Sequence, residues 1–339
     1  MLNFCTLFDS FYLTRGLAMY QSLEKTCDNF HLFIFAFDDK SFDILNKLQL
    51  KNATIIPLID FEDNKLLAVK PTRTKAEYCW TCTSSTILYV IEKYNVPSCT
   101  YLDADLYFFK NPKLLFDEMG DKSILITEHR YPPKFNRVDS SGIYCVQFIT
   151  FVNDANGLEA LKWWRDACIE WCYNRYEDGK FGDQKYLDDW TTRFKGVHVL
   201  QHLGGGLALW NIEQYSLIER KGDLITFNNK VDDSKFEVIF FHFHHVRFFK
   251  NDILDLGWRQ PAKTIILNLF VPYIEILNEV ESYVKQVDSG FNIPLTNFEL
   301  INNAGVKNKI KYVIKMIFRY SVYDIKKIKK EYKKLSASN

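Results

Sequence analysis

Apolar runs and helically spaced apolar positions alternate along the first sixty residues. Residues 3–9, 31–37 and 53–58 are nearly continuous apolar runs, whereas 13–25 and 41–50 repeat apolar positions with the period of a helix. Strands that alternate with helices usually form a parallel sheet flanked by helices, so the pattern predicts an α/β fold. Such sheets bind their ligands at the carboxyl ends of the strands.

The same two patterns continue to about residue 250. A polar loop is expected over 71–80, and the chain has neither a G-x-G-x-x-G motif nor a P-loop. The further elements predicted are helices over 81–94 and 155–177, strands over 123–127, 142–151 and 197–202, and a hairpin that joins 224–228 to 236–246.

Two carboxylates stand in the apolar and aromatic run over residues 99–109. Asp103 and Asp105 are separated only by Ala104, and residues two apart in a strand point to the same face. Burying unpaired carboxylates is costly, so the pair needs a counter-charge. Oxygen ligands suit a hard divalent cation, Mn²⁺ or Mg²⁺, that also binds substrate phosphates. The alternative is a surface strand end whose aspartates face water or an arginine.

A second polar cluster lies in the stretch F-H-F-H-H-V-R. His242 and His244 share one face of a predicted strand, His245 points to the other face, and Arg247 follows. An imidazole that joins two carboxylates still suits Mn²⁺. The pattern therefore favours a metal or phosphate site over the alternative of two histidines satisfied in a core.

Polar residues in three loops are further candidates for ligand contacts. Arg73 and Lys75 can meet a diphosphate, and Tyr78 can stack on a base, unless they are ordinary surface residues. Asp183 and Gln184 follow a helix and a glycine, where side chains project from a rigid scaffold. The run around Gly205 lets backbone approach a ligand, although it also suits a flexible turn.

Composition narrows the class of protein. The chain has 339 residues, 47% hydrophobic and 25% charged, as in globular proteins. Its net charge of +1 conceals a basic tail, because residues 307–334 hold eleven Lys and Arg against two acids. The rest is acidic, so we expect no nucleic-acid partner. No signal peptide is recognised, which predicts a cytoplasmic protein with reduced cysteines.

The order of these motifs resembles that of GT-A-fold nucleotide-sugar glycosyltransferases, most closely glycosyltransferase family 8. In that family a D-x-D pair binds Mn²⁺ and the donor diphosphate, as Asp103-Ala104-Asp105 would here. A D-Q pair follows the long helix and matches Asp183-Gln184. A late histidine strand, H-Y-x-G, falls at residues 242–245, where His245 replaces the glycine.

The resemblance covers about residues 1–250 and implies a GT-A-like catalytic domain. Its nucleotide-sugar half would span about 1–110 and its acceptor half about 111–250, with a helical C-terminal region over 251–339. The first strand of the family binds the nucleotide. The donor-binding candidates are Thr6, Phe8, Asp9, Arg73, Lys75, Tyr78, Asp103, Ala104, Gly205 and Arg247.

The resemblance also implies a function. We expect transfer of a sugar, with a UDP-sugar favoured as donor, to a glycan or lipid-linked acceptor in bacterial surface polysaccharide assembly. The catalytic candidates are Asp183 and Gln184, and the metal ligands are Asp103, Asp105, His242 and His244. A sugar-1-phosphate nucleotidyltransferase is one alternative, although the glycine-rich loop expected after its first strand is missing. A non-catalytic nucleotide-sugar-binding protein is the other.

The basic tail predicts an amphipathic helix. Ile310, Ile314, Ile317 and Phe318 recur at helical spacing, and lysines fill the positions between them. Such a helix can lie on an anionic membrane surface, which would make the protein peripheral on the inner face of the cell membrane. The alternative is a helix that packs its apolar stripe on the catalytic domain.

Overall fold

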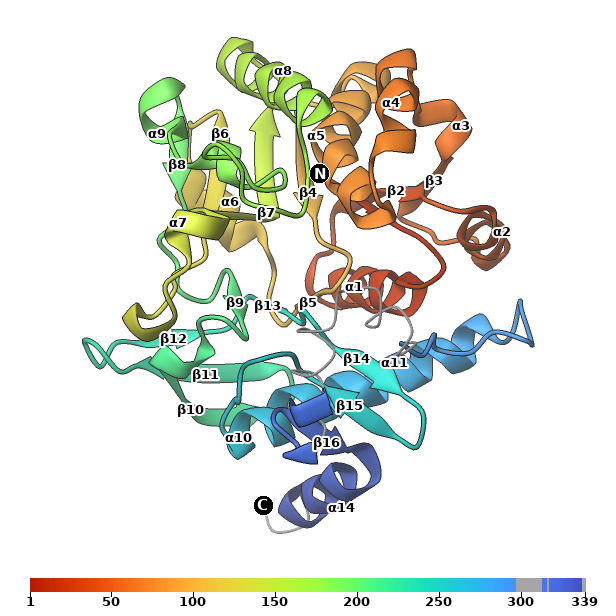
Figure 1. Ribbon diagram of the computed structural model, residues 1–339, viewed down its shortest axis with the longest axis vertical. Helices are drawn as coiled ribbons and strands as arrows, with labels where there is room; N and C mark the ends of the chain where they lie inside the picture. Colours follow the sequence, from red (N-terminus) through yellow and green to blue (C-terminus); the bar gives the residue numbers. More distant parts are fainter. Residues whose placement is uncertain (297–312, 316, 337–339) are drawn as a thin grey trace.

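The computed structural model describes residues 1–296, 313–315 and 317–336. Its centre is a seven-stranded sheet in the order β3-β2-β1-β4-β7-β6-β8 (Figure 1), in which only β7 runs antiparallel to its neighbours. The strands are β1 (Leu2–Phe8), β2 (Phe30–Ala36), β3 (Ala53–Pro57), β4 (Ser98–Leu102), β6 (Ile124–Glu128), β7 (Tyr144–Val152) and β8 (Val197–Val199). The predicted α/β fold with a mostly parallel sheet is confirmed.

Helices cover both faces of this sheet. Successive side chains of a strand point to opposite faces, so Phe4 and Phe8 of β1 join one core while Cys5 and Leu7 join another. Helices α5 and α8 cover the second core and α1 the first. The helices before residue 200 are α1 (Leu13–Thr26), α2 (Asp39–Leu48), α3 (Leu58–Phe61), α4 (Asn64–Val69), α5 (Lys75–Tyr94), α6 (Lys113–Met119), α7 (Val138–Ser141), α8 (Ala155–Glu170) and α9 (Trp190–Arg193).

Three small sheets lie beyond the end of the main sheet at which β4 terminates, in the lower part of Figure 1. They hold β5 (Leu106–Phe108), β13 (Phe240–His242) and β9 (Leu207–Ala208); β10 (Tyr215–Lys221), β11 (Leu224–Asn229) and β12 (Lys235–Glu237); and β14 (Arg247–Phe249), β15 (Ile253–Asp255) and β16 (Val322–Asp324). The chain passes directly from β4 in the main sheet to β5 in this layer. The turn between these strands therefore lies where the two layers meet.

Several predicted elements differ from those observed, and the strand expected over 99–109 is divided into β4 and β5 by a turn at residues 103–105. The expected loop over 71–80 is helical from Lys75, because the Thr74 hydroxyl accepts from the Glu77 amide and the Glu77 carboxylate accepts from the Thr74 amide, which caps α5. Helix α8 ends at Glu170 rather than near 177. The expected return strand 236–246 is divided into β12, which pairs with β11, and β13, which pairs with β5 and β9.

The region after residue 250 contacts α1. Its helices with described bounds are α10 (Lys263–Ile265), the π-helical segment η5 (Ile266–Phe270), α11 (Val271–Val284) and α14 (Ile325–Ser336). Helix α11 contacts α1, and apolar residues of η5 and α11 join the same core as Phe4. A domain boundary near residue 250 stays a prediction. Among the helices in the described part of the chain, none is long and apolar enough to cross a membrane.

Candidate active site

The turn between β4 and β5 places the D-A-D stretch at the carboxyl edge of the sheet. Strands β1 and β4 are parallel neighbours, so Asp9 and Asp103 both follow strands that end at this edge. The Asp103 amide donates to the Gln147 carbonyl at 3.0 Å, and the Asp105 carbonyl accepts from the Phe243 amide at 2.9 Å. Backbone bonds from β7 and from the segment after β13 therefore hold both ends of the turn.

Strand pairing brings His242 to these aspartates. Strand β13 runs antiparallel to β5 with His242 opposite Leu106, one residue beyond Asp105. The His242 Nε2 lies 2.9 Å from Asp105 Oδ1 and 3.7 Å from Asp103 Oδ2. Both His242 and Asp105 are buried. The structure thus brings the two aspartates and the late histidine together in three dimensions.

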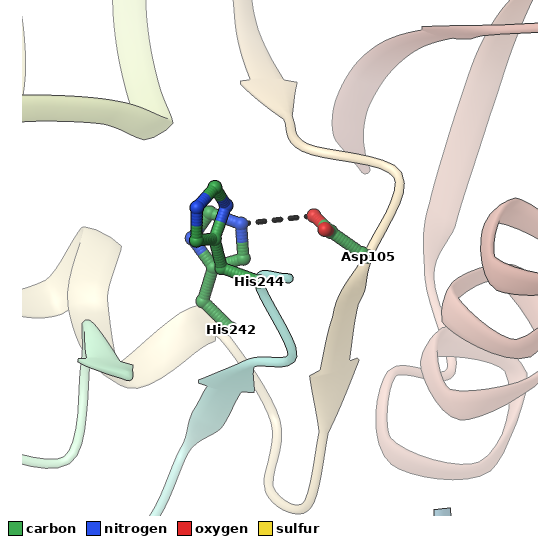
Figure 2. A group of neighbouring side chains, drawn as sticks. All are labelled: Asp105, His242 and His244. Carbon is green, nitrogen blue, oxygen red and sulfur yellow. Dashed lines mark ion pairs between the residues drawn. The ribbon is translucent and has the colours of Figure 1, made fainter. Parts of the chain in front are cut away.

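His244 reaches the same site from a different backbone position than expected. Strand β13 ends at His242, so His244 lies in the turn that follows. Figure 2 shows both imidazoles beside the Asp105 carboxylate. One donor atom from each of Asp105, His242 and His244 lies within 4.8 Å of the other two.

The charges at this site are strongly coupled. Burial opposes ionisation of both Asp105 and His242, but their mutual attraction is stronger. It lowers the pKa of Asp105 to about 2 and raises the pKa of His242 well above its ordinary value. Burial raises the pKa of Asp103 to about 6. The charge of Asp105 adds to this rise, and the charge of His242 opposes it.

Asp183 lies close enough to Asp103 to feel its charge. The Trp164 indole of α8 donates to the Asp183 carbonyl at 2.8 Å and fixes the turn after this helix. Burial raises the pKa of the Asp183 carboxyl to about 7, and the negative charge of Asp103 adds to the rise. The side chain of Gln184 is turned to α7, where its Nε2 donates to the Ser141 carbonyl at 2.5 Å.

The candidates from the loop over 71–80 are divided in space. Lys75 pairs with Asp9 at 2.5 Å, at the carboxyl end of β1. The Arg73 guanidinium lies over the ring of Tyr173, 3.9 Å from its centroid, and donates to two carbonyls at the end of α8. Tyr78 is buried, and its hydroxyl donates to Glu62 at 2.7 Å. Lys75 therefore lies beside Asp9 at the carboxyl end of β1, whereas the side chains of Arg73 and Tyr78 bind other parts of the protein.

The remaining candidates are mostly buried. Thr6 is fully buried in β1, and Ala104 is buried between the two aspartates. The ring of Phe8 fills the space beside Gly16, where a Cβ atom would come within 2.3 Å of it. A Cβ on Gly205 would likewise meet the side chains of Leu200 and Leu115. The structure thus surrounds these four positions with protein atoms.

Arg247 and two residues that the sequence did not single out lie around the metal-ligand candidates. Arg247 begins β14, and its charge acts on His244 and on Tyr12. The charge of Asp105 also acts on the Tyr12 hydroxyl. The half-buried ring of Trp210 lies 5.1 Å from that of His242 and 5.7 Å from that of His244, between centroids.

Gln147 is a third residue that the sequence did not single out. Its Oε1 lies 2.8 Å from the Nδ1 atom of His242. Gln147 is fully buried in β7. An amide in a buried strand that is otherwise mostly apolar is the signal that indicates such a role, because buried polar groups need partners.

The donor set fits a divalent cation. Carboxylate oxygens and imidazole nitrogens together suit Mn²⁺, and the short separations of Asp105, His242 and His244 allow all three to reach one ion. Asp103 lies at the rim of this group with its side chain 30% exposed. A cation here would be reached from solvent past Asp103 and His244.

Comparison with known proteins gives relatives over most of the chain. No protein-family model matches it. The uncharacterized protein YfnD of Bacillus subtilis (strain 168) is 31% identical over 295 residues, covering 85% of this chain and 92% of YfnD. YfnF of the same organism, also uncharacterized, is 28% identical over 298 residues, covering 85% and 96%. Among solved structures, an active-site mutant of the galactosyltransferase LgtC matches with a TM-score of 0.45 and 12% identity, covering 73% of this chain and 88% of LgtC.

Proposed function

The chain belongs to the same family as YfnD of Bacillus subtilis, and from the geometry of its site we propose that it is a metal-dependent glycosyltransferase. The donor is a nucleotide-diphosphate sugar, with a UDP-sugar favoured. The acceptor is a glycan or a lipid-linked sugar in the assembly of a bacterial surface polysaccharide. The D-A-D, D-Q and late histidine motifs, which resemble those of GT-A enzymes, support this choice of reaction.

One observation carries the proposal. Asp105, His242 and His244 offer donor atoms within 4.8 Å of one another, with Asp103 beside them at the carboxyl edge of the sheet. These side chains would hold Mn²⁺ or Mg²⁺ through oxygen and nitrogen ligands. When bound, such an ion stabilises the negative charge that develops on a leaving diphosphate. Lys75, which pairs with Asp9 at this edge, and Arg247, whose charge acts on His244, are basic residues that can add to that stabilisation.

Asp183 is the proposed catalytic carboxylate. It is buried next to the Asp103 charge, and its pKa of about 7 leaves it partly ionised near neutral pH. A carboxylate there can stabilise positive charge at the anomeric carbon or take the proton of the acceptor hydroxyl. Gln184 remains a candidate for contacts with the donor sugar. Its amide nitrogen is held by the Ser141 carbonyl, which leaves its carbonyl oxygen for such a contact.

The proposed location is the inner face of the cell membrane. Val313, Ile314, Ile317 and Phe318 expose 56%, 49%, 70% and 77% of their surface. In α14 Ile328 is buried, Leu335 is exposed, and the lysines are mostly exposed. Exposed apolar side chains next to a basic helix suit an anionic lipid surface. Ile310, also expected in the apolar stripe, lies outside the described residues.

Product analysis tests the proposed reaction. The purified chain is incubated with Mn²⁺ and a panel of UDP-sugars, and release of UDP is measured with and without lipid-linked acceptors. A glycosyltransferase releases UDP slowly by hydrolysis and faster with its acceptor. A nucleotidyltransferase would release no UDP, and in a parallel reaction supplied with UTP and a sugar 1-phosphate it would form pyrophosphate and a UDP-sugar. Binding of a UDP-sugar without either product would contradict the enzyme and favour the binding protein.

A further inference from the structure

Gln147 contacts both segments that supply the proposed metal ligands. Strand β7 lies between β4 and β6 in the main sheet, and all but the last of its nine residues are buried. The main-chain carbonyl of Gln147 accepts from the Asp103 amide at 3.0 Å. Its side-chain Oε1 lies 2.8 Å from the Nδ1 atom of His242. One residue thus joins the turn that carries the aspartates to the strand that carries the histidine.

The chemistry of an amide oxygen decides what His242 can do. A carbonyl oxygen can only accept a hydrogen bond, so Nδ1 must carry the hydrogen in this contact. In the neutral ring the lone pair then lies on Nε2, the atom that faces Asp105 at 2.9 Å. We propose that Gln147 is a positioning residue that selects this tautomer of His242 and thereby keeps Nε2 available to a divalent cation. This inference rests on the metal-binding part of the proposed function and not on sugar transfer.

The other end of the amide shows what the opposite orientation would change. Gln147 Nε2 is buried and has no hydrogen-bond partner among the described residues. It points toward Gly206, because a Cβ atom there would lie 3.1 Å from Nε2 and 2.8 Å from Thr127 Cγ2. If the amide were turned over, Nε2 would donate to Nδ1 and the hydrogen of His242 would move to Nε2. That tautomer has no lone pair for a cation, so the turned amide would block the site.

A histidine that binds a metal through one ring nitrogen usually donates a hydrogen bond from the other, and Gln147 would be the acceptor of that bond. Such partners fix the tautomer and orientation of the ring, and their removal typically costs about 10- to 100-fold in metal affinity. Gln147→Met keeps most of the side-chain volume but removes the acceptor. Gln147→Glu keeps an acceptor at the same position. Thr150→Val is the matched control, because Thr150 is buried in the same strand and bonds Thr100 away from the site.

The test is the affinity of the full chain for Mn²⁺, measured from the free-ion signal in electron paramagnetic resonance. We expect about 10- to 100-fold weaker binding by Gln147→Met, and near-normal binding by Gln147→Glu and Thr150→Val. Equal affinity of Gln147→Met and wild type for Mn²⁺ overturns the role of Gln147 but leaves the proposed metal site standing. If the wild type itself takes up no Mn²⁺, the metal-binding part of the proposed function falls, and this inference falls with it.

A second measurement uses the wild type and so does not depend on how a variant folds. Nitrogen-15 NMR of the histidine-labelled chain, loaded with Mg²⁺, reports which ring nitrogen of His242 carries hydrogen. The His242→Gln spectrum assigns the signal. Hydrogen on Nδ1 supports the proposal, and hydrogen on Nε2 overturns it.

Discussion

The Nε2 atom of His242 lies 2.9 Å from Oδ1 of Asp105, so the site joins two distant parts of the chain at one contact. Without a cation, this contact is an ion pair between a protonated imidazole and a carboxylate. With a cation, the same two atoms become ligands and the imidazole must be neutral. Protons and metal therefore compete for His242.

This competition predicts how stability depends on pH. Because the pKa of His242 is raised in the folded protein, its contribution is complete below about pH 6.5, the usual unfolded value, and is lost as pH rises through the folded value. The pKa of Asp105 is lowered to about 2, so its contribution is present above about pH 4 and is lost toward pH 2. In EDTA, the melting temperature of the wild type should fall more steeply above pH 7 than that of His242→Gln. Parallel curves would show that the pair is not ionised.

We expect that replacing Asp183 lowers turnover without weakening donor binding. Replacing it by Asn removes the charge but keeps the size of the side chain. Loss of a carboxylate that acts in acid–base catalysis lowers kcat by about 100-fold or more, and KM for the donor should stay within about twofold. Asp178→Asn is the matched control, since Asp178 is exposed and has a positive φ that Asn also tolerates. Unchanged kcat in Asp183→Asn would reduce Asp183 to a structural residue.

The main sheet was predictable because its strands are short apolar runs with local boundaries. The start of α5 was missed although Thr74 and Glu77 have the spacing of a capping box, because the polar residues over 71–80 also suit a loop. The division of the return strand into β12 and β13 depends on distant partners. The amides of Ile239 and Phe240 donate to the Gly204 carbonyl, and no local pattern indicates that contact.

In the candidate site, too, some residues were recognisable from the local sequence, whereas others depend on contacts with distant parts of the chain. Asp103, Asp105 and the two histidines were recognisable because they interrupt apolar stretches at a spacing of two. Gln147 was not singled out, because its role depends on β7 and β13 meeting across the site. Arg73 could not be placed from the sequence either, since it is the C-terminal end of α8 that supplies its carbonyl partners.

The helix cap at Thr74 predicts a measurable loss of stability. Thr74→Ala removes the side-chain oxygen that accepts from the Glu77 amide and should cost about 1 kcal/mol in the free energy of unfolding. Thr192→Ala, on the short helix α9, is the control, because its exposed hydroxyl bonds only the Asp189 carbonyl. Urea unfolding measures both. An equal and negligible loss in both variants would show that the cap does not stabilise α5.

The exposed residues near the C-terminal region predict binding to anionic lipid. The full chain should pellet with vesicles that contain phosphatidylglycerol in low salt and be released in high salt. Ile317→Ser and Phe318→Ser should each weaken binding by about tenfold, because partial burial of such a side chain contributes about 1.5 kcal/mol. Ile59→Ser is the control, since Ile59 is 86% exposed on α3. Equal pelleting of all variants would leave these residues without a lipid-binding role.

The most direct test of the proposed function is the metal dependence of UDP release in Asp105→Asn. This substitution keeps the volume of the side chain but removes the charge that pairs with His242. We predict that wild type and Asp117→Asn, a change on the exposed face of α6, release UDP from the donor only with Mn²⁺ or Mg²⁺. Asp105→Asn should remain folded and lose the metal-stimulated release. Full activity of the wild type in EDTA, or of Asp105→Asn with Mn²⁺, would contradict the account.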